Sequence, residues 1–219
     1  MPDFKYIAKA AQVRASAWKD SDYFMLAESS MQRHWEHYIA PLIGVLNLST
    51  VVEIGCGHGS NTDRLSRLAD QTICTDTSQE CIEYCRTRFK GVQGVKPVLT
   101  NGYDLSAIKS ASATLVYSFG SMVHSEPEVV EAYVAEAARI LKANGAALFH
   151  VSNWTGGYGH DFRTQPHWRN FMSQDLMKYF AKRNGLTIEF ARVVSWDESL
   201  GTEIGELNHL DCLYILKKA

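Results

Sequence analysis

The sequence predicts an α/β fold in which a mostly parallel sheet carries helices on both faces. The first observation is residues 50–60, a short apolar stretch that runs into a glycine loop and then into a helix start. The second is the alternation of strand-like and helix-like segments after this loop, which is typical of a parallel sheet. The third is composition, because 219 residues with 46% hydrophobic and 21% charged residues can form one domain with an ordinary core.

The segment ahead of the glycine loop is predicted to be helical. Residues 3–47 contain no convincing strand pattern, and apolar residues recur at helical spacing from Asp22 to Leu46. Pro41 falls inside this pattern, so we expect the helix to break or kink there. One or two helices should therefore pack ahead of the sheet.

The remaining chain contains segments with the apolar or β-branched character of strands. Residues 50–54 are nearly all apolar or β-branched, as expected for a strand buried on both faces. Pro97 places the third strand at a sheet edge, because proline cannot donate a hydrogen bond to a neighbouring strand. The expected strands are residues 50–54, 71–76, 95–100, 113–119, 145–151, 186–196 and 209–216, and an acidic loop joins the last two.

Helices are expected between these strands. Residues 77–80 and 125–128 each fit the capping-box pattern, and Ser173 is of the type that caps a helix. Asn144-Gly145 is a typical helix stop. The expected helices are residues 61–69, 77–90, 125–142 and 173–184.

Charge and hydropathy restrict the partners. The chain has 22 Lys plus Arg against 24 Asp plus Glu, a net charge of -2, and no basic run stands out. Neither a nucleic acid nor an anionic membrane is therefore an expected partner. No apolar segment resembles a signal peptide or approaches membrane-spanning length, so a cytoplasmic protein is expected. The oligomeric state stays open, a homodimer included.

Cysteine and histidine spacing predicts no metal site. Cys81 and Cys85 are one helical turn apart, and we interpret them as residues of a helix face rather than as disulfide or metal ligands. His160, Asp161 and His167 are suitable ligand types, but their spacing matches no known motif. The chain has five cysteines, with no Cys-x-x-Cys pair: Cys56, Cys74, Cys81, Cys85 and Cys212.

The glycine loop indicates a nucleotide-type site. Gly55, Gly57 and Gly59 leave no Cβ along one edge, so the backbone can lie close to a ligand. The next residue is Ser60, where a dinucleotide fingerprint requires glycine, so the fit to NAD or FAD is imperfect. Asp76 ends the following strand and can accept both hydrogen bonds of a ribose diol. The alternative for Asp76 is an acid that stabilises a helix N-terminus.

These motifs together resemble the class I S-adenosylmethionine-dependent methyltransferases. The resemblance is carried by residues 53–59, 74–78 and 115–119, and by the helix at 129–142 that leads into residues 143–148. The order of these motifs is specific, and the two final strands fit the terminal hairpin of that family.

The resemblance implies a single Rossmann-like domain with a seven-stranded, mostly parallel sheet that ends in an antiparallel hairpin. It covers residues 45–151 closely. The domain would consist of an N-terminal helical lid at 1–47, a cofactor-binding core at 48–151, and a substrate-side insertion with the hairpin at 152–219.

The resemblance also implies the cofactor, S-adenosyl-L-methionine. Glu53 and the backbone of residues 55–59 would hold its methionine end, and Asp76 its ribose hydroxyls. Asn101 would contact the adenine, although an Asn-Gly turn explains this residue equally well. The expected cofactor-binding residues are Glu53, Gly55, Cys56, Gly57, Gly59, Asp76, Thr77, Asn101, Gly102, Tyr103, Ser118, Phe119 and Gly120.

Two histidines are candidate general bases. His124 lies just past the fourth strand, where it would face the methyl donor and could take a proton from a substrate hydroxyl. A structural role, in which His124 orders its own loop by hydrogen bonding, is an equal alternative. His150, at the end of the fifth strand, is the second candidate, and its alternative is a polar residue that closes the strand. We assign His34 and His37 to a helix surface.

The expected substrate-binding residues come from both ends of the chain. They are Tyr23, Trp35, Asn153, Trp154 and Arg169. Tyr23 and Trp35 could place an aromatic face near the cationic sulfonium, and core packing is their alternative. Asn153 and Trp154 follow His150 at the same sheet edge. Arg169 could bind an anionic substrate group or pair with an acid.

The sequence therefore predicts methyl transfer to a small-molecule or saccharide acceptor, at oxygen, with a histidine as base. Residues 168–173 and 210–212 are similar to a bacterial subgroup associated with polysaccharide or secondary-metabolite modification. An NAD-dependent oxidoreductase is one alternative, but Ser60 and the final hairpin argue against it. The other is a non-catalytic adaptor, and the intact glycine loop and Asp76 argue against that.

Overall fold

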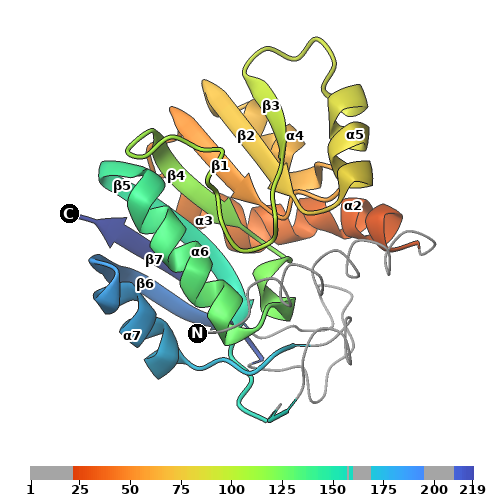
Figure 1. Ribbon diagram of the computed structural model, residues 1–219. Helices are drawn as coiled ribbons and strands as arrows, with labels where there is room; N and C mark the ends of the chain where they lie inside the picture. The colour runs from red at the N-terminus through yellow and green to blue at the C-terminus, as the bar shows by residue number, and fades with distance from the viewer. Residues whose placement is uncertain (1–21, 157, 160–168, 195–209) are drawn as a thin grey trace.

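The computed structural model describes residues 22–156, 158–159, 169–194 and 210–219. Within these residues, seven strands form one sheet in the order β3-β2-β1-β4-β5-β7-β6 (Figure 1). The strands are β1 (Thr50–Ile54), β2 (Gln71–Asp76), β3 (Val95–Leu99), β4 (Ala113–Ser118), β5 (Leu141–Ser152), β6 (Leu186–Val194) and β7 (Asp211–Lys218).

The strand directions confirm the predicted sheet. Strands β3, β2, β1, β4 and β5 pair in parallel, whereas β7 runs antiparallel to both β5 and β6. Pro97 lies in β3 at the edge, as expected. The strand order reverses between β1 and β4, and such a switch point opens a crevice at the carboxyl ends of the strands.

Helices cover both faces of the sheet. They are α2 (Tyr23–His34), α3 (Ala40–Ile43), α4 (Ser60–Ser66), α5 (Gln79–Arg88), α6 (Pro127–Ile140) and α7 (Gln174–Arg183), with a π-helical turn η1 (Trp35–Ile39) and a 3₁₀ turn η2 (Met122–His124). One apolar core joins α6 and α7 to the face that carries Val52 and Val116. A second joins α2, η1, α3 and α4 to the face that carries Val51 and Leu115. The alternation of neighbouring strand residues between two cores is the expected pattern for a sheet buried on both sides.

The N-terminal helical pattern is interrupted, as predicted. The chain passes from α2 through η1 into α3, and Pro41 lies in the first turn of α3. Proline lacks a backbone N–H, and its ring crowds the carbonyl group one turn earlier. The wider π-turn that precedes Pro41 relieves this crowding. Tyr38 and Ile39 in this turn are buried against the sheet.

The predicted boundary between α6 and β5 is wrong. Helix α6 ends at Ile140, and β5 begins at Leu141, so the strand starts four residues earlier than expected. Leu141 is fully buried and pairs with Ala113, which draws it into the sheet. Asn144 adopts a φ of 61°, and the register shifts between Ala113 and Leu115. Asn144-Gly145 therefore marks an irregularity within a strand rather than a helix stop.

Two of the three predicted caps need correction. Ser78, rather than Thr77, caps α5, because its side chain accepts a hydrogen bond of 3.2 Å from the Cys81 N–H. Helix α6 has no side-chain cap and begins at Pro127, whose fixed φ suits the first helical position. Ser173 caps α7 as predicted, accepting from the Leu176 N–H at 3.2 Å.

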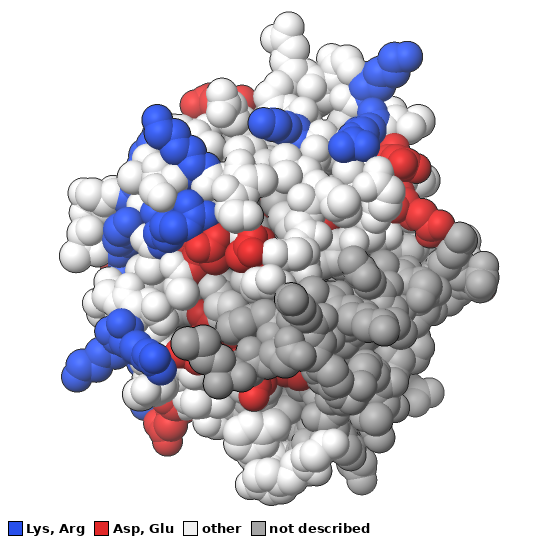
Figure 2. Space-filling model, in the orientation of Figure 1, with Lys and Arg blue, Asp and Glu red and all other residues white. Residues whose placement is uncertain are grey.

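On the face shown in Figure 2, Lys and Arg side chains lie in small groups with acidic side chains beside some of them. Among the described helices, none is both long and apolar enough to cross a bilayer.

Candidate cofactor and acceptor site

A cavity of about 720 Å³ lies where β1, β2 and β4 end, and α2 forms its opposite wall. It brings together residues that are far apart in the sequence. The predicted site residues that line it are Tyr23, Gly55, Cys56, Gly57, Asp76, Thr77, Gly102, Phe119, Gly120, His124, His150 and Arg169. Candidates for the cofactor, the acceptor and the base therefore meet in one chamber.

The glycine loop lies against the cavity with no room for side chains. Gly55 has a φ of 72°, and a Cβ there would lie 2.0 Å from the Ser121 Oγ. Gly57 has a φ of 52°, and a Cβ there would lie 2.9 Å from the Phe24 ring. The loop thus needs glycine both for its backbone conformation and for its close approach to α2 and to Ser121, in the turn after β4.

Asp76 joins this loop to the end of β2. Its Oδ2 accepts a hydrogen bond of 2.9 Å from the Gly57 N–H, and its Oδ1 accepts one of 2.9 Å from the Ser78 N–H. Burial raises the pKa of the carboxyl, and the backbone hydrogen bonds partly oppose that shift. A carboxylate offers about four lone-pair positions, so Asp76 retains acceptor capacity toward the cavity.

Glu53 has a different environment from Asp76. It is 1% exposed, it accepts a hydrogen bond from the Thr62 hydroxyl, and it is absent from the cavity lining. Burial raises the pKa of its carboxyl to about 8. Glu53 therefore fastens α4 beneath β1 as a largely neutral acid at pH 7.

Four other predicted cofactor residues also lie outside the lining. They are Gly59, Asn101, Tyr103 and Ser118. The Asn101 Oδ1 accepts from the N–H groups of Tyr103 and Asp104, so its side chain closes its own turn, which is the alternative reading of this residue. Ser118 donates to the Ile54 carbonyl at 3.1 Å and thereby ties β4 to β1.

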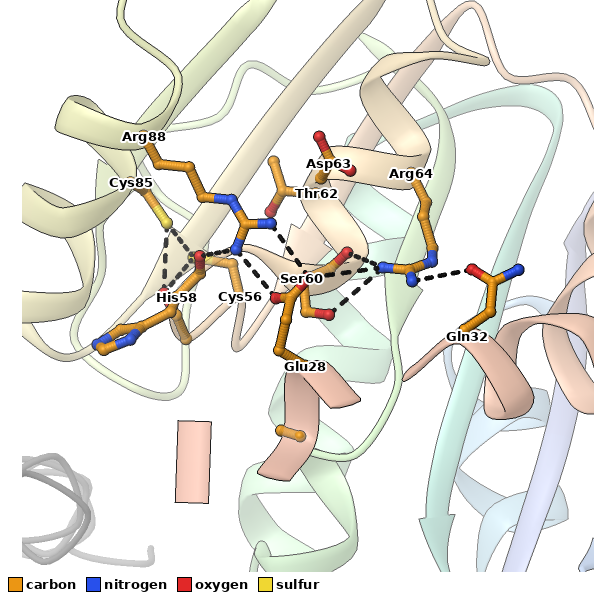
Figure 3. A network of polar contacts seen from close by, with 12 residues as sticks. Glu28, Gln32, Cys56, His58, Ser60, Thr62, Asp63, Arg64, Cys85 and Arg88 are labelled. Atoms are coloured by element: carbon orange, nitrogen blue, oxygen red, sulfur yellow. Dashed lines mark hydrogen bonds and ion pairs between the residues drawn. The ribbon is translucent and has the colours of Figure 1, made fainter. Parts of the chain in front are cut away.

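Helix α2 is fastened to the glycine loop by stacking and by charge. The Phe24 and His58 rings stack with centroids 3.8 Å apart, and His58 stacks on Tyr84 at 3.9 Å. Arg88 binds Glu28 through two hydrogen bonds and donates to the His58 carbonyl at 2.9 Å (Figure 3). The Arg88 hydrogen bond lowers the pKa of Glu28. No spacing pattern in the chain indicates this clamp between α2 and the glycine loop, because its partners come from separate elements.

A buried acid organises the far wall of the cavity. Asp211 is 0% exposed, and Arg169 donates to it from Nε at 2.9 Å and from Nη2. The His150 Nε2 lies 3.3 Å from the same carboxylate. Burial alone would raise the pKa of Asp211, but the hydrogen bonds from Arg169 and His150 hold it well below its usual range. The acid that pairs with Arg169 is thus a buried one that sequence reasoning missed.

This arrangement assigns the protons of His150. The Gly120 N–H donates to Nδ1 of His150 at 3.2 Å, so Nδ1 is an acceptor and Nε2 carries the proton toward Asp211. Both ring nitrogens are therefore engaged. His150 holds the loop at Gly120 in place, which makes it a weaker candidate for the base than the sequence suggested.

His34 was wrongly assigned to the helix surface. It lines the cavity from α2, and its ring lies 5.9 Å from that of Phe119. Burial lowers its pKa to about 4, and the nearby His150 adds to the shift. His34 is consequently a neutral polar group at pH 7. Helical spacing alone could not reveal it, because the helix face that meets the cavity is polar in part.

Three predicted acceptor residues lie away from the cavity. Trp35 packs against the core formed with α3 and the sheet, so core packing is the correct reading. The Asn153 N–H donates to the Leu210 carbonyl, and Trp154 forms a bridge with Phe171. His160, Asp161, His167, Trp168 and the acidic loop at 195–209 lie outside the described residues.

Residues 51–145 match a family described as a methyltransferase domain. These residues carry a methyltransferase domain. S-adenosylmethionine is the cofactor of this domain, and the glycine loop beside the Asp76 carboxylate suits it. The match leaves the dinucleotide-dependent oxidoreductase without support.

Individual relatives agree with this assignment. A demethylmenaquinone methyltransferase of Tropheryma whipplei (strain Twist) is 28% identical over 112 residues, which are 51% of this chain and 45% of the relative. The chain thus spans about half the length of the curated relatives it matches.

Solved structures share the fold. Geranyl diphosphate C-methyltransferase from Streptomyces coelicolor A3(2), bound to Mg²⁺, geranyl diphosphate and S-adenosyl-L-homocysteine, is 16% identical with a TM-score of 0.65, covering 82% of this chain and 76% of that one. An S-adenosylmethionine-dependent methyltransferase from Mesorhizobium loti is 15% identical with a TM-score of 0.67, covering 82% and 97%.

Proposed function

We propose that this protein transfers the methyl group of S-adenosylmethionine to a small-molecule acceptor held between α2 and the strand ends. The observation that carries the proposal is the joining of the glycine loop and Asp76 at one wall of the cavity. The cofactor supplies a methyl carbon that is already activated by the positive sulfonium. The chain has to hold donor and acceptor in line, an orientation effect that can supply about 7–11 kcal/mol.

The acceptor side of the cavity favours a molecule with an apolar or aromatic body. Tyr23, Met31, Phe119, Val123 and Tyr133 line the cavity together, and each offers apolar surface. Tyr23 is protonated at neutral pH, like any tyrosine, and burial raises its pKa further. A saccharide is the second acceptor class, since sugars also stack on aromatic faces.

We further propose transfer to an acceptor hydroxyl with His124 as the base. His124 lines the cavity from η2, and the Asn170 side chain fixes this turn by donating to the His124 carbonyl at 2.6 Å. His150 is engaged at both nitrogens, and His34 is too weak a base. His124 would take the hydroxyl proton as the new carbon–oxygen bond forms and the carbon–sulfur bond breaks, which leaves S-adenosylhomocysteine. It would then release that proton to solvent.

The test is a screen of acceptors with methyl-labelled S-adenosylmethionine. The panel should contain phenols and quinols, isoprenoid alcohols, sugars, and amines as a nitrogen control. We expect label in a methyl ether of an apolar or aromatic hydroxyl compound. Label confined to the amines would contradict the oxygen assignment, and label in the sugars alone would contradict the apolar acceptor.

A further inference from the structure

Three buried thiols converge beneath the glycine loop. Cys56 belongs to the loop, Cys74 to β2 and Cys85 to α5, and they are 6%, 0% and 0% exposed. Their Sγ atoms all lie within 4.8 Å of one another, and those of Cys56 and Cys85 are 3.9 Å apart. The spacing of Cys81 and Cys85 did not reveal this cluster, because its three members come from three elements.

The sulfur spacing matches that of a three-coordinate metal site. A metal–sulfur bond is about 2.3 Å long, so three sulfurs in a plane around one ion lie about 4.0 Å apart. The Cys56–Cys85 separation of 3.9 Å is close to this value and the other two pairs lie within 4.8 Å, so small movements of the side chains would complete the triangle. Because each sulfur is held by a different packed element, the site is largely formed before any ion arrives.

The surroundings of the cluster favour a cation. The Asp76 carboxyl lies beside the cluster, because it accepts a hydrogen bond of 2.9 Å from the N–H of Gly57, the residue after Cys56. The Cys85 Sγ also lies 3.3 Å from the Gly57 carbonyl oxygen. Cys56 lines the cavity, which provides an entry route from solvent.

We propose that Cys56, Cys74 and Cys85 form a binding site for a soft monovalent cation, for which Cu(I) is the probe. Thiolates select soft ions, and Cu(I) accepts three sulfur ligands, whereas protein-bound zinc almost always has four ligands. Each thiol that binds loses its proton to solvent, and neither sulfur nor copper changes its oxidation state. The proposal is independent of methyl transfer.

The experiment titrates the full chain with Cu(I), without oxygen and with a phosphine reductant, against a Cu(I)-specific chelator as competitor. We expect one ion per chain, and X-ray absorption should show three sulfurs at about 2.3 Å. Failure of the wild-type chain to take Cu(I) from the chelator would overturn the proposal, as would a bound ion with nitrogen or oxygen ligands in place of the three sulfurs.

Variants locate the site. Cys74→Ala and Cys85→Ala should each lower Cu(I) affinity by more than about 100-fold, since loss of an outer-shell partner alone costs 10- to 100-fold. Cys212→Ala is the matched control, because Cys212 is equally buried but lies in β7. Thermal unfolding checks that each variant folds. If one of the two cluster variants does not fold, the other still tests the site. Equal affinity in the cluster variants and the control would refute the site.

Discussion

The Gly57 N–H donates a 2.9 Å hydrogen bond to Asp76, so the two predicted halves of the cofactor site form one unit. The position of the loop therefore depends on Asp76, the residue that is also proposed to bind the cofactor ribose. A substitution at Asp76 should therefore disturb the glycine loop as well as remove a contact to the cofactor.

Asp76→Asn should weaken the binding of S-adenosylhomocysteine by about 10- to 100-fold. The reason is that a hydrogen bond to a charged group contributes about 1.5–3 kcal/mol, and the substitution also loosens the loop. Calorimetry measures the affinity. Asp70→Asn is the control, because Asp70 is exposed and lies immediately before β2. Wild-type affinity in Asp76→Asn would remove Asp76 from the cofactor site.

His124→Ala should lower turnover on a hydroxyl acceptor by about 10²- to 10⁴-fold, the usual contribution of a general base. The affinity for S-adenosylhomocysteine should stay unchanged, because His124 is assigned to the acceptor. Initial rates across a pH series provide the measurement, with the exposed His37→Ala as control. An unaltered rate on the true acceptor would assign His124 to loop structure alone.

Phe24→Ala should weaken cofactor binding by about 2- to 10-fold. An aromatic pair contributes about 0.5–1.5 kcal/mol, and the Phe24–His58 stack holds α2 against the loop. The same calorimetric titration measures this loss. Tyr179→Ala removes an exposed aromatic ring from α7 and should change nothing. If both variants bind alike, the clamp does not contribute to the site.

Because of Glu53, the free energy of unfolding should decrease as the pH rises. Its folded-state pKa of about 8 lies above the ordinary value of 4.5, so the folded chain holds a proton that the unfolded chain releases. This contribution is fully present below pH 4.5 and is lost as the pH rises through 8. Glu53→Gln should flatten that decline.

Urea unfolding across this pH window measures the effect. The control is Glu189→Gln, since Glu189 is exposed on β6. A wild-type stability that rises toward pH 8 in step with Glu53→Gln would show that Glu53 is ionised in the folded protein.

The elements that sequence reasoning predicted well are those with local signals. The apolar β1, the glycine loop and Asp76 lie within one strand–loop–helix–strand run, and their order alone indicated the family. The errors arose where tertiary contacts decide. Leu141 satisfies a helical pattern, but its burial beside Ala113 places it in β5.

The acceptor side was predicted less well for the same reason. Asp211, His34 and the three-thiol cluster gain their roles only when distant elements meet. Arg169 and Asp211 are 42 residues apart in the chain, and no spacing rule links them. Trp35 was predicted from its place on the front helices and Trp154 from its place after His150 at the sheet edge. In the fold, Trp35 packs against the core and Trp154 forms a bridge with Phe171.

The central claim is that the cavity beneath α2 is an S-adenosylmethionine site. Calorimetric titration of the full chain with S-adenosylhomocysteine, and separately with NADH, tests it most directly. The account predicts one S-adenosylhomocysteine per chain, weakened in Asp76→Asn, and no heat from NADH. Binding of NADH with no response to S-adenosylhomocysteine would contradict it.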